Sequence, residues 1–210
     1  MKLVLVRHGR PDEDDATRPH DPGLRDDGWR QARAVARLLA GERVDRIVSS
    51  PLLRARQTAE PLAERLKLPV DIVDGWAEAD RGSARYRSTE TLRAMGEEKW
   101  QRFLADPVRF VGGDPERFVA DVLGALTAVL DAARADDQVV IFTHGLPINV
   151  VLSRLLGLQR IVHFQPFYGS MTRLRARGTG GQALQRGAIG VVSVNETAHH
   201  AWPDEEATTA

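Results

Sequence analysis

Short apolar runs alternate along the chain with segments of helical periodicity. Residues 3–6 and 139–142 contain no polar side chain, which is typical of strands buried on both faces of a parallel sheet. Residues 27–39 carry apolar side chains three and four positions apart, and Gly41 stands just beyond them, so an amphipathic helix is expected there. The alternation predicts an α/β fold, a three-layer α/β/α sandwich with a mostly parallel sheet.

The remaining periodic segments continue this pattern along the chain. Further strands are expected at residues 46–48, 70–73, 170–176 and 184–194, and further helices at residues 52–66, 115–135 and 146–156. The last two strands are separated by Gly178-Thr179-Gly180-Gly181, a run of turn-forming residues that predicts an antiparallel hairpin at the sheet edge. The tail after Asn195 is expected to be frayed.

The first strand ends directly in Arg7-His8-Gly9. A planar guanidinium can hold two oxygens of a phosphoryl group, so Arg7 is a candidate phosphate ligand. Neutral imidazole is a usable nucleophile near pH 7, and Gly9 lets the backbone approach a ligand closely. The tripeptide alone is a weak signal, because a histidine at a strand end is more often structural.

Two other strand ends carry matching chemistry. The segment from Ser49 to Ala59 opens a helix and places Arg54 near its start, although a single arginine there is more often a solvated residue. The strand at residues 139–142 ends in Thr143-His144-Gly145, which repeats the His-Gly ending of the first strand. Because ligands collect at the carboxyl ends of strands in α/β sheets, these segments are expected to form one phosphate site.

The sequence resembles the histidine phosphatase superfamily, which includes cofactor-dependent phosphoglycerate mutases and many small phosphatases. The matching motifs occur in order over almost the whole chain: Leu5-Val6-Arg7-His8-Gly9, Gly28-Trp29-Arg30-Gln31-Ala32, residues 49–59, Ala77-Glu78, Thr143-His144-Gly145, and Asn195 followed by His199. Several separated motifs in the right order make the resemblance specific.

The resemblance implies a role for each matching residue. His8 is expected to be the phosphorylated nucleophile, and Glu78 the proton donor to the leaving oxygen. Asp74 and Asp80 lie close to Glu78 in the sequence and are the alternative acids. The remaining site residues are expected to bind the phosphate or the rest of the substrate; they are Arg7, Arg10, Arg54, His144 and Gly145.

The expected function is that of a metal-independent phosphomonoester hydrolase, which acts through a covalent phosphohistidine on a small phosphorylated metabolite. Two alternatives stay open: a mutase-type isomerase that returns the phosphoryl group to its substrate, and a phosphate-binding module without turnover. The family's mutases usually carry Glu after Arg-His-Gly and then a Trp-Asn pair, whereas this chain has Arg10-Pro11, which argues against a mutase. The acidic run at residues 12–15 would repel a second phosphate if it faced the site.

The stretch from residue 76 to residue 114 is the least regular part of the chain. Glycines and prolines interrupt its short helical stretches, which predicts a cap-like insertion over the site within one domain spanning residues 1–210. Three of its basic side chains either contact the non-reacting part of a substrate or face solvent, and both interpretations stay open; they are Arg81, Arg85 and Arg87. Three of its aromatic side chains are expected to pack the cap; they are Trp76, Trp100 and Phe103.

Composition narrows the set of partners. The chain has 29 basic and 29 acidic residues, a formal net charge of zero, so neither a nucleic acid nor a membrane surface is indicated. It has no cysteine, which excludes disulfides and thiolate catalysis. The histidines outside the motifs lack the spacing of metal ligands, and there is no P-loop, so no metal and no cofactor are expected.

The expected partner is therefore a small-molecule phosphomonoester, with a phosphoprotein as the alternative, and the oligomeric state stays open. The first apolar run is too short for the core of a secretory signal, and no run approaches the length of a membrane-spanning helix. A cytoplasmic location is expected.

Overall fold

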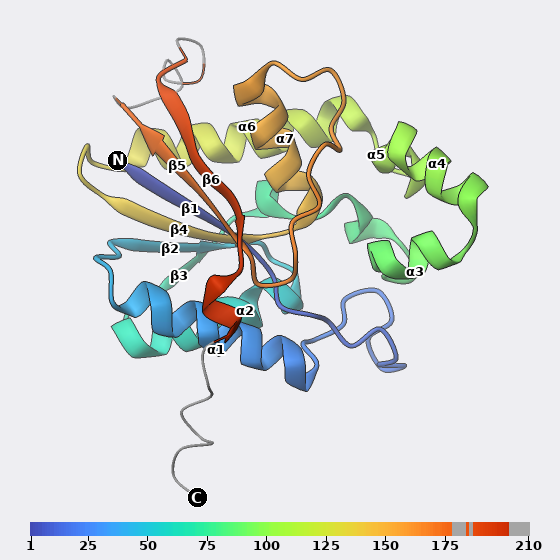
Figure 1. Cartoon of the computed structure of the whole chain (residues 1–210), viewed down its shortest axis with the longest axis horizontal. Coiled ribbons are helices and arrows are strands. Elements are labelled where there is room, and N and C mark those ends of the chain that lie inside the picture. The colour runs from blue at the N-terminus through green and yellow to red at the C-terminus, as the bar shows by residue number, and fades with distance from the viewer. Residues whose placement is uncertain (178–183, 185–186, 202–210) are drawn as a thin grey trace, which may run out of the picture.

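A mixed six-stranded sheet forms the centre of the computed structural model, which describes residues 1–177, 184 and 187–201 (Figure 1). Its strand order is β3-β2-β4-β1-β5-β6. The strands are β1 (Lys2–Arg7), β2 (Arg46–Ser49), β3 (Val70–Ile72), β4 (Gln138–Thr143), β5 (Met171–Ala176) and β6 (Ile189–Glu196). The first four strands are parallel, and β5 and β6 add an antiparallel pair at one edge, as predicted.

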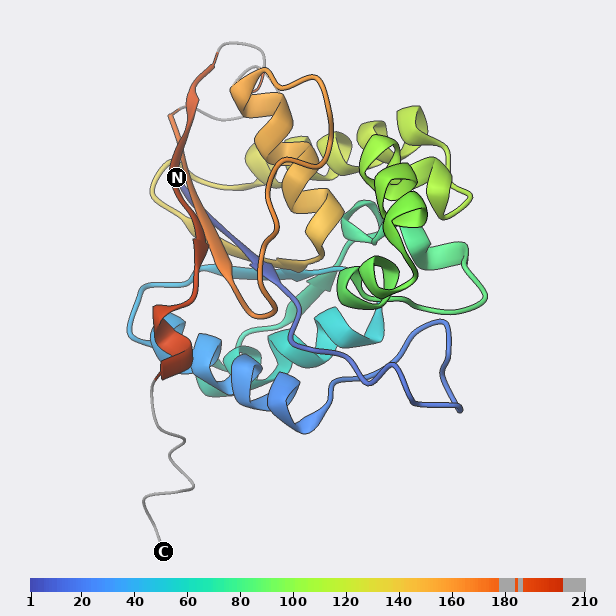
Figure 2. The same ribbon diagram turned by 45° about the vertical axis from the view of Figure 1, so that its right-hand side comes forward.

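Helices cover both faces of this sheet. Helices α1 (Asp26–Ala40) and α2 (Leu53–Leu66) pack on one face, and α6 (Pro115–Ala132) and α7 (Gly145–Leu156) on the other (Figures 1 and 2). Alternate residues of β1 and β4 face these two layers and are almost fully buried. A strand with a core on each side has no solvent-facing position, which explains the uninterrupted apolar runs. The predicted three-layer sandwich is confirmed.

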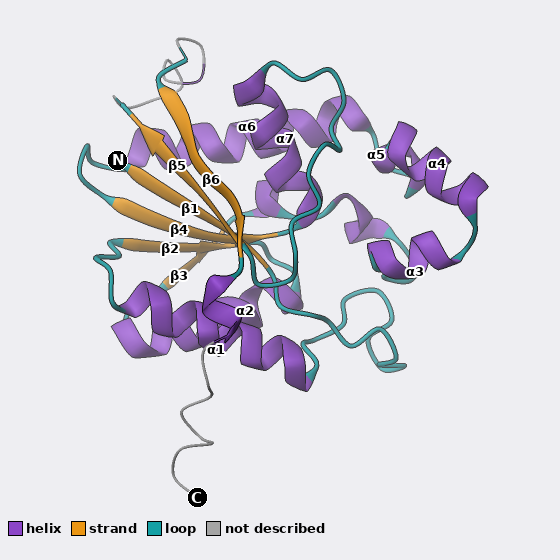
Figure 3. Ribbon diagram, viewed as in Figure 1, coloured by secondary structure: helices purple, strands orange, loops and turns teal. Residues whose placement is uncertain are grey.

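Short helices lie beyond the carboxyl ends of the central strands, where the cap-like insertion was expected (Figure 3). They are the 3-10 helices η1 (Asp74–Trp76) and η2 (Ala79–Gly82) and the helices α3 (Thr89–Ala94), α4 (Glu97–Ala105) and α5 (Pro107–Phe110). The rings of Trp100 and Phe103 stack at 5.6 Å, and Phe110 meets Phe103 edge to face at 5.8 Å, so aromatic contacts join α4 to α5. The expectation for Trp76 is wrong, because this fully buried side chain packs in the central core with α6.

The structure also corrects three boundaries near the ends of elements. Strand β6 begins at Ile189 and not at residue 184, and α6 ends at Ala132, because Ala133 is already extended. The predicted turn at residues 178–181 lies outside the described residues. The tail is not frayed up to residue 201: it forms the 3-10 helix η3 (Ala198–Ala201), with His199 only 2% exposed. A long-range hydrogen bond from His199 to Gly169 holds it, and no local periodicity could signal that contact.

None of the helices within the described ranges combines the length and apolar character that crossing a bilayer requires.

Two glycines bring the loop after β1 against the start of α1. A Cβ atom at Gly28 would lie 2.1 Å from the carbonyl oxygen of Arg10, and one at Gly9 would lie 2.5 Å from the carbonyl oxygen of Gly28. Both obstacles are backbone atoms that cannot rotate away. The close contact therefore requires glycine at both positions and fixes the chain immediately after His8.

Gly28→Ala is expected to lower the free energy of unfolding by about 1–3 kcal/mol, because the added methyl group forces two backbone segments apart. The matched control is Gly124→Ala in α6, where an added Cβ meets no atom within 4 Å. This control is expected to raise the free energy of unfolding by up to about 1 kcal/mol through helix propensity. Urea unfolding measures both, and equal stability of Gly28→Ala and the wild type would contradict the contact.

Candidate active site

The paired ends of β1 and β4 bring two histidines together. Arg7 pairs in register with Thr143, and the backbone N–H of His8 donates to the carbonyl oxygen of Thr143 at 2.9 Å. The next residue of each strand end is a histidine, and the ring centroids of His8 and His144 lie 4.9 Å apart. The convergence of the two His-Gly endings is therefore present in the structure.

The hydrogen bond of His8 defines its tautomer. Its Nδ1 atom lies 2.7 Å from the carbonyl oxygen of Gly9, which can only accept, so Nδ1 carries the proton and Nε2 keeps its lone pair. His8 is 2% exposed. Burial, together with the nearby cations of Arg54 and Arg7, lowers the pKa of His8 well below its ordinary value. The ring is therefore neutral at physiological pH.

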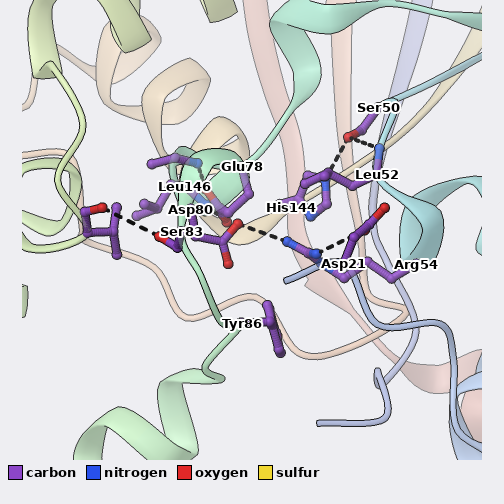
Figure 4. A network of polar contacts seen from close by, with 12 residues as sticks. Asp21, Ser50, Leu52, Arg54, Glu78, Asp80, Ser83, Tyr86, His144 and Leu146 are labelled. Carbon is purple, nitrogen blue, oxygen red and sulfur yellow. Dashed lines mark hydrogen bonds and ion pairs between the residues drawn. The ribbon is translucent and has the colours of Figure 1, made fainter. Parts of the chain in front are cut away.

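His144 is held by a residue from a third strand end. Its Nε2 lies 2.7 Å from Oγ of Ser50, which follows β2, and that hydroxyl also accepts the N–H of Leu52 at 3.2 Å (Figure 4). Burial and the cation of Arg54 lower the pKa of His144 well below its ordinary value. Its Nδ1 atom is buried and has no hydrogen-bond partner among the described residues.

Two buried guanidinium groups flank the histidines. Arg54 is fully buried; its Nη2 lies 3.1 Å from Asp80 and its Nη1 3.6 Å from Asp21 (Figure 4). Arg7 donates to the carbonyl oxygen of Pro166 at 2.5 Å and is 6% exposed. The Nε atom of each arginine is buried without a hydrogen-bond partner in the described part of the chain. The site therefore holds a concentrated positive charge with donors still available.

The only two tyrosines of the chain pack on these guanidinium groups. Arg7 lies 4.0 Å from the ring centre of Tyr168, and Arg54 lies 4.5 Å from that of Tyr86. Their hydroxyl groups are 3.4 Å apart, and Tyr168 also donates to Glu90 at 3.3 Å. Burial raises the pKa of both tyrosines, so they remain neutral. The sequence analysis missed both, and their rarity is the only signal that could have found them.

Glu78 is held by backbone N–H groups from two different segments. Its carboxylate accepts the backbone N–H groups of Ala79 at 3.0 Å and of Leu146, in the first turn of α7, at 3.2 Å. Burial and the neighbouring negative charge of Asp80 raise the pKa of Glu78 to about 7. A carboxyl group with this pKa can donate and accept a proton near neutral pH.

The two alternative acids occupy different surroundings. The side chain of Asp74 is 74% exposed and pairs with Arg81 at 3.3 Å, outside the cavity. Asp80 lines the cavity but is paired with Arg54. Glu78 combines a place in the cavity wall with a pKa raised to about 7.

A cavity of about 610 Å³ opens in front of these residues, and its walls include Arg7, His8, Glu78 and Gly145. Arg54 and His144 are fully buried. Arg10 is not among the wall residues: it lines a neighbouring hollow and lies 3.4 Å from Asp27.

The other charged residues that the sequence singled out divide around this cavity. Arg85 and Arg87 line it, whereas Arg81 does not. Residues 12–15 also lie outside it, and Glu13 accepts the backbone N–H of Ser88 at 3.1 Å and the hydroxyl of Thr91 at 2.9 Å. The acidic run therefore does not face the site. In the described ranges, no group of three or more His, Cys, Asp or Glu side chains could hold a metal ion.

The C-terminal segment holds the backbone at Arg7 and His8. The N–H of Gly169 lies 3.0 Å from the carbonyl oxygen of Arg7 and 3.1 Å from that of His8. The carbonyl oxygen of Gly169 accepts Nε2–H of His199 at 2.9 Å, and Asn195 accepts the N–H of Phe167 at 2.7 Å. Asn195 and His199 thus hold the loop that carries Tyr168. Both motif residues therefore have a structural role.

Arg7, His8 and His144 lie at the carboxyl ends of β1 and β4, and Arg54 joins them from the first turn of α2. Together with a carboxyl group of raised pKa they form an arrangement suited to phosphoryl transfer. The model of the histidine phosphatase superfamily (branch 1) matches residues 3–188. The chain belongs to this superfamily, and it is an enzyme of the histidine phosphatase type.

Similar proteins carry both phosphatase and mutase names. The chain is 31% identical over 166 residues to phosphoserine phosphatase 1 of Hydrogenobacter thermophilus, covering 75% of this chain and 77% of that one. It is 30% identical over 164 residues to the probable phosphoglycerate mutase GpmB of Proteus mirabilis, covering 75% and 76%. A phosphoserine phosphatase from Entamoeba histolytica, solved with 3-phosphoglyceric acid, has a TM-score of 0.71 at 25% identity and covers 95% of this chain and 98% of that one.

Proposed function

We propose that the protein hydrolyses phosphomonoesters of small metabolites through a covalent phosphohistidine on His8. The observation that carries the proposal is a neutral, buried imidazole whose free Nε2 lone pair lies in the field of Arg7 and Arg54. An imidazole that stays unprotonated beside two cations is a nucleophile prepared for an anionic electrophile.

The donors that lack partners account for phosphate binding. Nε of Arg7, Nε of Arg54 and Nδ1 of His144 are buried and have no hydrogen-bond partner among the described residues. A buried donor without a partner costs about 1–3 kcal/mol, which a phosphate oxygen would offset. These groups would also stabilise the charge that spreads over the phosphoryl oxygens during transfer, so the mechanism assigns no step to a metal ion.

The first half of the reaction transfers the phosphoryl group to the enzyme. Nε2 of His8 attacks phosphorus in line, the ester P–O bond breaks, and its electron pair goes to the leaving oxygen. Glu78 gives its proton to that oxygen, which leaves as an alcohol. The products of this half are phosphohistidine, the alcohol and the Glu78 carboxylate.

The second half restores the enzyme. The Glu78 carboxylate takes a proton from water as the water oxygen bonds to phosphorus. The P–N bond breaks, its electron pair returns to Nε2 of His8, and inorganic phosphate is released. A carboxyl group with a pKa of about 7 suits both halves, because it must act first as an acid and then as a base.

His8→Ala is expected to reduce the release of phosphate from p-nitrophenyl phosphate at least about 1,000-fold, because no other group replaces the nucleophile. The wild type is expected to keep its rate in EDTA. The matched control is His20→Ala, which removes an exposed histidine from the loop before α1 and should leave the rate unchanged. Full activity of His8→Ala, or loss of wild-type activity in EDTA that added metal restores, would refute the proposed mechanism.

For alkyl phosphates, which have poor leaving groups, the wild-type kcat/KM is expected to fall as pH rises through about 7. The protonated form of Glu78, which donates to the leaving oxygen, disappears over that range. Glu78→Gln is expected to remove this descending limb and to slow alkyl phosphates by about 100-fold or more, with a much smaller effect on activated aryl phosphates.

The matched control for this experiment is Asp74→Asn, which changes an exposed carboxylate four residues earlier and should leave the pH profile intact. Persistence of the same descending limb in Glu78→Gln would assign it to another acid, with Asp80 the first candidate.

A further inference from the structure

The cavity lined by Glu78 also has a set of apolar wall residues. The cap contributes Leu92, Trp100, Phe103, Leu104, Phe110 and Val111, and the body of the protein contributes Leu146, Val162 and Phe164. These nine residues define the apolar chamber. Leu146 connects the two parts of the cavity, because its backbone N–H binds the Glu78 carboxylate and the residue also lines the chamber.

Two of the polar wall residues are already engaged by hydrogen bonds within the protein. The amide of Asn149 donates to the carbonyl oxygens of Gly145 and Phe164, and its oxygen accepts the N–H groups of His163 and Phe164. The hydroxyl of Ser83 donates to the carbonyl oxygen of Val111 at 3.4 Å.

The arginines near the chamber belong to its rim. Arg85 and Arg87 are exposed, and both also line the polar hollow that contains Arg10 and Glu13. They mark the boundary between the two cavities, and the apolar chamber lies on the cap side of that boundary.

The aromatic walls are fixed before any ligand arrives. Phe103 is 6% exposed and is held between Trp100 and Phe110 by the stacked and edge-to-face contacts described above. Arg93 lies 5.8 Å from the ring centre of Trp100 and restrains it further. Walls already held by their neighbours lose little conformational entropy on binding, so apolar contact there translates into affinity.

The geometry of in-line attack determines which part of the substrate can enter the apolar chamber. His8 approaches phosphorus from the side opposite the leaving oxygen, so the leaving group lies on the side of its proposed proton donor, Glu78. We infer that the apolar chamber binds the leaving group, and that the preferred substrates are phosphomonoesters of bulky apolar alcohols or phenols. The inference rests on the proposed function and adds the substrate class to it.

The test compares kcat/KM for methyl, ethyl, butyl and hexyl phosphate with the values for phosphoserine and 3-phosphoglycerate. Simple primary alcohols differ little as leaving groups, so a trend with chain length reports contact with the chamber. The expected gain from ethyl to hexyl phosphate is about fourfold per methylene. A flat series, or a higher kcat/KM for phosphoserine or 3-phosphoglycerate than for hexyl phosphate, would overturn the inference.

Trp100→Ala and Leu104→Gln are expected to cut the gain per methylene to under about twofold, since they remove or interrupt apolar wall. Circular dichroism and thermal unfolding show whether both variants are folded. Met95→Ala is the matched control, because this cap residue is 38% exposed and lies outside the cavity. An unchanged chain-length trend in both chamber variants would contradict the assignment.

Binding of non-hydrolysable alkylphosphonates, measured by calorimetry, separates this inference from the proposed function. If no ester releases phosphate, the proposed function fails, and the phosphonate series alone decides the character of the chamber. Affinity that rises with chain length and loses that rise in Trp100→Ala supports the apolar chamber. Affinity independent of chain length overturns it.

Discussion

The site depends on two guanidinium groups buried at the carboxyl edge of the sheet. Burying a charge is costly unless it is paired, and Arg54 is compensated by Asp80, Asp21 and the face of Tyr86. The same charges also influence the pKa values of the neighbouring titratable groups. Burial and these cations lower the pKa of His8, and burial together with Asp80, which is paired with Arg54, raises the pKa of Glu78. One cluster of buried charge thus acts on both the proposed nucleophile and the proposed acid.

The fold makes this cluster possible because three neighbouring parallel strands end at one level. β1 is followed by His8, β4 by His144 and β2 by Ser50, so hydrogen bonds of the sheet fix the spacing of the catalytic candidates. Antiparallel β5 contributes in another way: the loop before it brings Tyr168 and Gly169 beneath the end of β1. The strand ends fix the positions of the histidines, and cap residues form part of the cavity wall.

The sequence predicts the layers and the strand ends well, because continuous burial leaves a continuous apolar run. It also finds Arg7, His8, Arg54 and His144, which occur in motifs at those strand ends. It does not find Tyr86, because that residue acquires its place through a tertiary contact with an arginine about thirty positions away. The sequence does not predict the burial of His199 either, because its hydrogen-bond partner Gly169 belongs to another segment.

The sequence does not distinguish the surroundings of Arg10 and Glu78. Both are polar residues beside a motif, and only the tertiary structure shows that their environments differ. The side chain of Arg10 is half exposed beside Asp27, whereas Glu78 meets the start of α7 at the cavity wall. Packing of the cap against the sheet edge decides this difference, and the periodicity of residues 76–114 is too irregular to predict that packing.

The central claim is that the phosphoryl group passes through His8. The most direct measurement is a rapid acid-free quench of the enzyme with an excess of aryl phosphate, followed by digestion and mass spectrometry of the peptide that contains Arg7-His8-Gly9. The account predicts one phosphoryl group on His8, formed at least as fast as turnover and lost on further incubation. Steady release of phosphate with no phosphorylated His8 at any time, or phosphorylation at another residue at the rate of turnover, would contradict it.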